Sequence, residues 1–223
     1  TFPIELLPLP GFLDLSTGML SDAEVFIDGE LVGTTPLTQL ELAAGEHTLL
    51  LRKARYEPLE TSLTMTGRST SQSLELELLP AWANVSLQTT PSGATVTVDG
   101  EVVGTTPLTA ELLDGEREVL VKLQAHKAWT SKLTITARED LTVAPITLEP
   151  ADGLVLLRSA PTNASVTVNG IYKGQTPLEL SLPPTSNHQL LFFLNGYEEE
   201  QRQLRTQADG ESNVTVTLKP IVN

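Results

Sequence analysis

The sequence predicts an all-β chain of three tandem small β-sandwich modules of about seven short strands each, arranged as a semi-rigid rod. Three observations predict this fold class. A stretch of 16 residues recurs three times along the 223 residues, an Asp-Gly or Asn-Gly pair lies inside each copy, and apolar and polar residues alternate on both sides of that pair. Because the apolar period is two, we expect no helix of useful length.

The repeats set the domain boundaries. Three stretches share most of their residues and read AEVFIDGELVGTTPLT at 23–38, ATVTVDGEVVGTTPLT at 94–109 and ASVTVNGIYKGQTPLE at 164–179. The first two agree at 12 of 16 positions, and Pro80, Pro150 and Pro220 follow one another at intervals of 70 residues. We therefore expect domains at 1–80 (with an N-terminal lead-in), 81–150 and 151–223. Each is longer than most solenoid repeats, so each should have its own core.

Structural turns are expected at two places in each module. Two-residue hairpin turns need positive φ at both central residues, which Asp-Gly and Asn-Gly tolerate. Such turns are predicted at Asp28-Gly29, Asp99-Gly100 and Asn169-Gly170. Ahead of the hairpin, Gly93 occupies the position of Asp22 and Asn163, and all three residue types tolerate left-handed backbone. We expect the chain to kink there as it enters the hairpin strand.

Further strand-like runs complete the second module. Its apolar residues alternate with polar ones, which is typical of half-buried strands. The runs that flank the hairpin lie at 85–89, 108–112, 118–123, 131–136 and 141–148. Together with the two hairpin strands they give about seven strands in 70 residues, which predicts a β-sandwich.

The junctions between modules are short. Pro80 ends one module and the next strand is expected from Val85, so the link is too short to behave as a flexible coil. Trp82 lies in this junction, Phe12 is its counterpart ahead of the first module, and Asp152 is the counterpart ahead of the third. A buried aromatic ring there would fix the angle between modules. The expected rod measures something like 25–35 Å per module.

Charge and composition exclude several classes of protein. Lys and Arg number 14 against 28 Asp and Glu, and the net charge of −14 would repel nucleic acid and anionic membrane surfaces. Cysteine is absent, which excludes disulfides, thiolate catalysis and Cys-based zinc sites. No apolar run is long enough to span a bilayer, so we expect no membrane insertion by this segment. The net charge favours a monomer.

The sequence offers no catalytic constellation, so we expect neither an enzyme nor a cofactor. Phosphate-binding loops, nucleophile elbows and HExxH motifs are absent. His47, His126 and His188 occur one per module, which argues against a shared metal site, and His47 and His188 are expected to be solvated turn residues. Asp28 and Asp99 are better explained as turn formers than as Ca²⁺ ligands, because Ca²⁺ needs a denser set of oxygens. Whether Ca²⁺ binds stays open at this stage.

Two aromatic residues are the candidates for recognition. Aromatic rings anchor protein interfaces and stack on sugars. Trp129 has no aromatic counterpart in the other modules and is either an exposed anchor or a plug of the core or junction. Tyr172 follows the Asn169-Gly170 turn, where the other modules carry Val102 and Leu31, and it is expected to pack on the hairpin.

The chain resembles three tandem PEGA modules. The resemblance rests on Pro91-Ser92-Gly93-Ala94, on the V-D-G hairpin, on the G-T-T-P-L segment and on Gly196-Tyr197-Glu198, and it covers nearly the whole chain. The first module departs with Leu20 for the proline and Arg55-Tyr56-Glu57 for the G-Y-E, and the second carries Ala125-His126-Lys127 there. These departures argue against the G-Y-E as a shared ligand site.

The resemblance implies a small β-sandwich of bacterial envelope or extracytoplasmic proteins. We expect a non-catalytic array that acts as a spacer or protein-interaction arm. One alternative is a module that binds envelope glycan or peptidoglycan, and another is an accessory region of a kinase or formylglycine-generating-like enzyme whose catalytic domain lies outside this chain. Expected partners are another envelope protein or cell-wall glycan. The expected location is periplasmic or extracellular, and since the chain begins with Thr1, a membrane tether is expected outside it.

Overall fold

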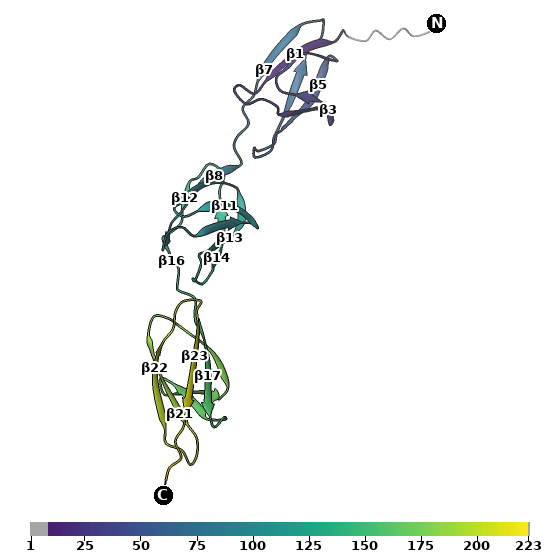
Figure 1. The fold of residues 1–223 in the computed structure, drawn as a ribbon. Helices are drawn as coiled ribbons and strands as arrows, with labels where there is room; N and C mark the ends of the chain where they lie inside the picture. Colours follow the sequence, from purple (N-terminus) through teal and green to yellow (C-terminus); the bar gives the residue numbers. More distant parts are fainter. Residues whose placement is uncertain (1–8, 223) are drawn as a thin grey trace, which may run out of the picture. The chain divides into compact units, whose positions relative to one another are not determined.

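The structure is a computed structural model that describes residues 9–222, and within that range every regular element is a β-strand (Figure 1). The predicted fold class, all-β with tandem sandwich modules, is confirmed. No element of the described range is a helix that could cross a membrane. Residues 1–8 of the predicted lead-in lie outside the described residues.

The first module contains seven strands in two sheets. They are β1 (Gly11–Ser16), β2 (Glu24–Ile27), β3 (Glu30–Thr34), β4 (Leu37–Leu42), β5 (Gly45–Arg52), β6 (Leu59–Met65) and β7 (Ser71–Glu75). One sheet has the order β4-β1-β7 and the other β3-β2-β5-β6. Every pair of neighbours is antiparallel except β1 with β7, which run parallel.

The core of the first module follows from the period-two pattern. Alternate side chains of β1 and β5 face inward, so Leu13 and Leu15 meet Leu49 and Leu51, and all four are buried. The residues between them point outward and are half-buried or exposed. The core is almost wholly aliphatic, as the low aromatic content requires.

The second module repeats the same strand orders. Its strands are β8 (Trp82–Leu87), β9 (Thr89–Thr90), β10 (Thr95–Val98), β11 (Glu101–Thr105), β12 (Leu108–Leu113), β13 (Gly115–Lys122), β14 (Trp129–Ile135), β15 (Leu141–Thr142) and β16 (Ile146–Thr147). The sheets run β12-β8-β15 and β11-β10-β13-β14, with a parallel pair of β16 and β9 beside them.

The third module has the order β20-β17-β23 in one sheet and β19-β18-β21-β22 in the other. Its strands are β17 (Gly153–Ala160), β18 (Ser165–Val168), β19 (Ile171–Gln175), β20 (Leu178–Leu182), β21 (Asn187–Phe193), β22 (Glu200–Arg205) and β23 (Glu211–Thr217). Val155, Leu157, Leu190 and Phe192 lie at the centre of its core. Each module therefore uses one plan, in which a parallel strand pair joins the beginning of the module to its end.

The first junction is shorter than the sequence predicted. Strand β8 begins at Trp82 rather than at Val85, so a single residue, Ala81, separates it from Pro80. The amide of Ala81 donates to the carbonyl of Arg55 at 2.9 Å, and its carbonyl accepts from the amide of Asp114 at 3.0 Å. Ala81 is thus held by residues on both sides of the junction. The second junction has only Ala151 and Asp152 between Pro150 and β17.

Candidate functional site

The hairpin turns use their acidic or amide side chains inside the fold. Asp28, Asp99 and Asn169 have φ of 50°, 49° and 50°, and each side chain accepts the amide of a neighbouring strand. The acceptor distances are 2.8 Å to Thr48, 3.0 Å to Glu118 and 2.8 Å to Gln189. No group of three or more His, Asp or Glu that could hold a metal ion occurs among residues 9–222.

The prediction that His47 and His188 are solvated turn residues is wrong. Both lie in strands, β5 and β21, with the side chain of His47 only 12% exposed and the whole of His188 only 3% exposed. In each strand the residues two and four positions further on are core residues. Because alternate side chains of a strand lie on the same face, each histidine also faces inward. The Nε2 of His188 donates to the carbonyl of Pro183 at 2.8 Å.

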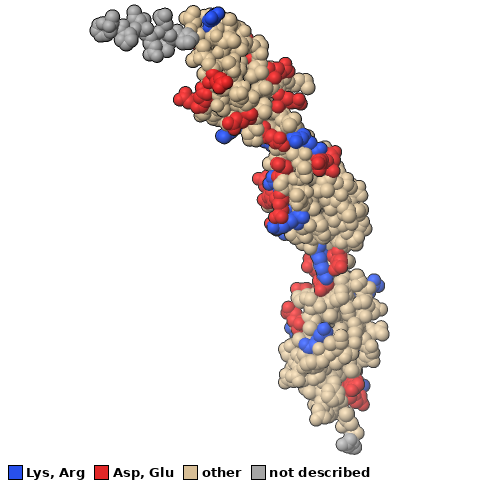
Figure 2. All heavy atoms as spheres, turned by 180° about the vertical axis from the view of Figure 1, so that it is seen from behind, with Lys and Arg blue, Asp and Glu red and all other residues tan. Residues whose placement is uncertain are grey.

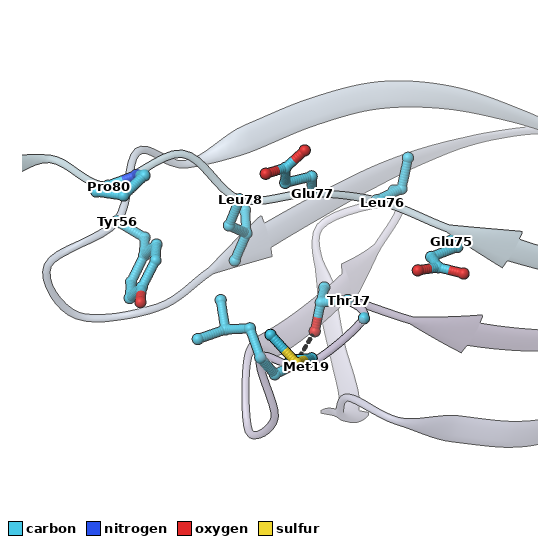
Figure 3. Close-up of a pocket in the computed structure, with 10 residues that line it drawn as sticks. Thr17, Met19, Tyr56, Glu75, Leu76, Glu77, Leu78 and Pro80 are labelled. Atoms are coloured by element: carbon cyan, nitrogen blue, oxygen red, sulfur yellow. Dashed lines mark hydrogen bonds between the residues drawn. The ribbon is translucent and has the colours of Figure 1, made fainter. Parts of the chain in front are cut away.

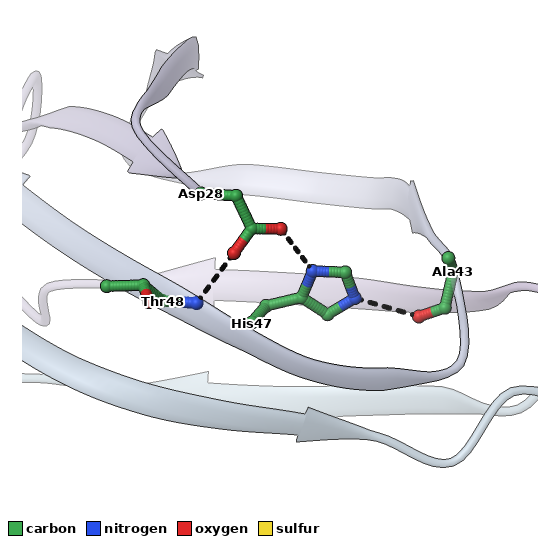
Figure 4. Close-up of polar contacts among 4 residues, drawn as sticks. All are labelled: Asp28, Ala43, His47 and Thr48. Atoms are coloured by element: carbon green, nitrogen blue, oxygen red, sulfur yellow. Dashed lines mark hydrogen bonds and ion pairs between the residues drawn. The ribbon is translucent and has the colours of Figure 1, made fainter.

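His47 has an acceptor on each ring nitrogen (Figure 4). Its Nδ1 lies 2.6 Å from Asp28 Oδ2 and its Nε2 lies 3.0 Å from the carbonyl oxygen of Ala43. Only the protonated ring can donate to both, so the Asp28 contact, followed by the Ala43 contact, raises the pKa of His47. The His47 contact and then the Thr48 amide lower the pKa of Asp28.

The second module carries a permanent cation at the corresponding place. Arg117 lies 3.1 Å from Asp99 Oδ2, while the Glu118 amide and then Arg117 lower the pKa of the Asp99 carboxyl. In both modules a carboxylate that meets a basic side chain therefore ties the hairpin turn to the neighbouring strand, β5 or β13.

A buried pair of hydroxyl groups recurs in every module and was not predicted from the sequence. Its members are the second Thr of the G-T-T-P-L segment and a Thr or Ser 17 or 18 residues earlier: Thr35 with Thr17, Thr106 with Thr89, and Thr176 with Ser159. The same Thr oxygen accepts the amide of the Ala that ends the P-E-G-A segment, at 3.2, 3.1 and 3.1 Å. This second Thr recurs in all three copies, and that recurrence was the sequence pattern from which a structural role could have been predicted.

The turn before the hairpin completes this motif. Asp22, Gly93 and Asn163 have φ of 58°, 86° and 66°, and the amide of each donates to the carbonyl of that same buried Thr. The G-T-T-P-L and P-E-G-A segments are therefore two halves of one internal hydrogen-bonded unit. This internal bonding accounts for the recurrence of both segments.

The G-Y-E position holds the chain as it leaves each module. Tyr56, His126 and Tyr197 form β-bridges with Pro80, Pro150 and Pro220, and we call each bridge the exit clamp of its module. The residue before each has positive φ, 70° at Arg55, 58° at Ala125 and 84° at Gly196, which explains why this motif begins with glycine. The shared role of the position is this backbone bridge, which does not depend on the G-Y-E side chains.

Charged side chains near the exit clamps reach across the junction residues. Arg55 lies over the Trp82 ring, 5.7 Å from its centroid, and pairs with Glu111 Oε2 at 2.6 Å. Arg138 pairs with Glu57 at 2.8 Å. At the second junction Lys127 lies 3.2 Å from Asp152, a contact that raises the pKa of Lys127.

The four aromatic residues predicted to lie at a module junction or to take part in recognition lie in different settings. Trp82 is half-buried at the start of β8, whereas Phe12 is half-buried inside β1, opposite Glu41 and Ser71. Trp129 is half-buried at the start of β14 in the second module. Tyr172 lies in β19, the second strand of the hairpin in the third module, and is 60% exposed.

An opening lies in the first module, between residues 17–20 and 75–80 (Figure 3). It encloses a cavity of about 630 Å³ whose apolar lining includes Leu20, Tyr56, Leu76 and Leu78. Glu75 and Glu77 also border it. In Figure 3 the Glu75 carboxylate points toward the segment that carries Thr17. In the face drawn in Figure 2, acidic side chains are spread over the first module.

The solved structures that resemble this chain do so at low identity. The TIE protein of Bacillus anthracis is 13% identical with a TM-score of 0.40, and the match covers 96% of this chain and 51% of that protein, so the chain spans about half its length. BcpA, the major pilin subunit of Bacillus cereus, is 9% identical with a TM-score of 0.34, covering 95% and 99%. SGBP-B of Bacteroides ovatus, solved with a mixed-linkage heptasaccharide, is 12% identical with a TM-score of 0.15, covering 96% and 69%.

A comparison with curated proteins found no match. The family model of the PEGA domain, in contrast, matches three consecutive segments, residues 19–80, 82–152 and 153–221. These segments take up nearly all of the described residues, and each module contains the buried hydroxyl pair, the hairpin turn and the exit clamp. The chain therefore belongs to the PEGA domain family, as a tandem array of three such domains.

Proposed function

We propose that this array is a non-catalytic spacer that holds its two ends a set distance apart. The observation that carries the proposal is the absence of a free linker at the first junction. Ala81 is the one residue between Pro80 and β8, and its amide and carbonyl are bonded to residues of the two modules that flank it. A link of one hydrogen-bonded residue restricts bending far more than a flexible coil does.

The use of the recurrent polar residues supports a non-catalytic role. The turn side chain (Asp28, Asp99 or Asn169) and the buried hydroxyls of each module are occupied in internal hydrogen bonds. Catalytic groups need an asymmetric set held around a substrate, whereas these groups recur with the same partners in successive modules. We place the array in the bacterial envelope, periplasmic or extracellular, on the strength of its family.

Solution scattering on length variants tests the spacer role. Deleting residues 81–150 joins Pro80 to Ala151, which follows Pro150 as Ala81 follows Pro80, so the Pro-Ala link is retained while the side-chain contacts of Trp82 and Lys127 are lost. We expect the maximum dimension to fall by roughly 25–35 Å, the length of one module. The same data give the molar mass, which we expect to be that of a monomer. A maximum dimension that does not change with module number would overturn the spacer role.

A further inference from the structure

The parallel strand pair of the first module ends early. In the third module β17 and β23 pair from Leu154 to Ala160, and the Leu218 amide then donates to the Ala160 carbonyl at 2.8 Å. In the second module the Leu148 amide donates to the Thr90 carbonyl at 2.8 Å. In the first, the last bond runs from the Leu76 amide to the Ser16 carbonyl at 3.0 Å, and within the described range no hydrogen bond joins Leu78 to residues 17–20.

One additional residue accounts for the difference. Four residues separate Thr17 from Asp22, whereas three separate Thr89 from Gly93 and Ser159 from Asn163. The chain turns out of the sheet at Gly18, where φ is 63°, and the Leu20 amide donates back to the Thr17 carbonyl at 3.2 Å. This turn replaces the residues that would have continued the ladder.

The interrupted ladder leaves backbone groups at the opening. In a parallel pair, a residue of one strand donates its amide to a carbonyl of the neighbouring strand. The carbonyl of that same residue accepts the amide that lies two positions further along the neighbouring strand. At the edge of the opening these positions are the Leu76 carbonyl and the Leu78 amide, and in the described range neither has a backbone partner. An extended peptide that adds to such an edge gains main-chain hydrogen bonds.

The residues that line the cavity favour a ligand that carries a positive charge. The cavity of about 630 Å³ is within the range of ligand pockets, roughly 300–1,000 Å³, and its walls combine apolar and polar surface in similar amounts. Two carboxylates, Glu75 and Glu77, border it, and neither forms an ion pair with a described Lys or Arg. The Glu75 carboxylate sits over the Gly18 turn, with Oε1 3.3 Å from where a Cβ on that glycine would lie. Charge complementarity therefore calls for a cation.

We propose that the first module binds an extended segment of a partner protein that carries Lys or Arg between apolar residues. The segment adds to the edge at Leu76 and Leu78, its apolar side chains enter the cavity, and its cation meets Glu75 and Glu77. The proposal is independent of the spacer role, since it rests on a feature that only the first module has.

Peptide titration followed by backbone NMR tests the proposal on the full chain. The probes are an array of capped hexapeptides of Val, Ile and Thr with a central Arg, and the same array with a central Glu. We expect Arg peptides to shift the amide resonances of Glu77 and Leu78 saturably. A twin peptide with an N-methyl group on the residue that donates to the Leu76 carbonyl lacks this donor and should bind about fivefold more weakly, since one hydrogen bond is worth about 1 kcal/mol.

Variants of the protein test whether the peptide binds at this cavity. Replacing Gly18-Met19-Leu20-Ser21 with the Thr-Pro-Ser of the second module should close the ladder and abolish binding. Glu75→Gln with Glu77→Gln should weaken the Arg peptides about two- to fivefold per ion pair, whereas Glu41→Gln with Glu46→Gln makes the same charge change on exposed residues outside the cavity and should not.

Several results would overturn the proposal. These are equal binding of Arg and Glu peptides, an N-methyl twin that binds as well as its parent, resonance shifts confined to other parts of the chain, and no binding at millimolar peptide. The N-methyl twin leaves the protein unchanged, so it decides the matter even if the loop replacement fails to fold.

Discussion

The guanidinium of Arg55 lies over the ring of Trp82, 5.7 Å from its centroid. Arg55 precedes the exit-clamp residue of the first module, and Trp82 opens the first strand of the second. The carbonyl of Arg55 also accepts the amide of the junction residue Ala81, so one residue holds the junction by main chain and side chain. We therefore expect the stabilities of the two modules to be coupled through these residues.

Trp82→Ala should destabilise the first two modules together. An exposed cation–π contact contributes about 0.5–1 kcal/mol, and a loss of about 1 kcal/mol lowers the melting temperature by roughly 2–4 °C when two modules unfold as one unit. Calorimetry on residues 1–150 measures the effect. Arg55→Ala and the double variant complete a cycle, which should return a coupling energy of about 0.5–1 kcal/mol. An unchanged melt in Trp82→Ala would show that the ring carries no interdomain contact.

Thr106→Val should cost about 1–3 kcal/mol of unfolding free energy. The substitution keeps the shape but removes the oxygen that accepts the Ala94 amide and pairs with Thr89, so buried polar groups lose a partner. The adjacent Thr105 is exposed, and Thr105→Val should change the stability by less than about 0.5 kcal/mol. Urea titration of both variants makes the comparison, and equal effects would refute the role of the buried hydroxyl.

The His47 and Asp28 pair should make stability depend on pH. The pKa of His47 is raised in the folded state, so its contribution is present below the unfolded pKa and is lost as pH rises through the folded pKa. The pKa of Asp28 is lowered, so its contribution is lost in acid, as pH falls through its folded value. His47→Arg imitates Arg117 and should remove the loss above neutral pH while leaving the loss in acid.

Urea midpoints of the wild type and His47→Arg, measured across neutral and mildly alkaline pH, test this expectation. The difference between the two proteins should grow as pH rises through the folded pKa of His47. Parallel curves would mean that the imidazole does not need its proton to hold the turn.

Ala125→Gly should stabilise the second module and Gly196→Ala should destabilise the third. Both residues sit at the same position beside the exit clamp with positive φ, where a Cβ costs roughly 1–2 kcal/mol. Part of the gain in Ala125→Gly is offset by the greater freedom of glycine in the unfolded chain. Thermal melts of the two variants should therefore move in opposite directions, and shifts of the same sign would contradict this account.

The sequence predicted the strand content, the threefold plan and the family, because these depend on local patterns. Period-two alternation, Asp-Gly turns and repeated motifs act within a few residues of one another. The inward position of His188 was not predicted, although His188 alternates in step with Leu190 and Phe192 along the same strand. The prediction used the polar character of histidine and not its position in the strand.

Other features depend on contacts between distant parts of the chain. The bond between Thr89 and Thr106 joins residues 17 apart, and no local pattern shows that the two hydroxyls are buried together. The opening in the first module arises because one extra residue near Gly18 ends a pairing with residues about 60 positions further on. Alignment of the motifs alone hides such an insertion, since its effect falls on the partner strand.

The distance between the first and second modules tests the spacer account most directly. The chain has no cysteine, so Ser62→Cys and Glu101→Cys place one spin label on each module at exposed sites. Pulsed electron paramagnetic resonance should give a single narrow distance distribution, which broadens when Gly-Gly-Ser-Gly is inserted after Ala81. A wild-type distribution as broad as that of the insertion variant would contradict the account, because the junction would then behave as a flexible linker.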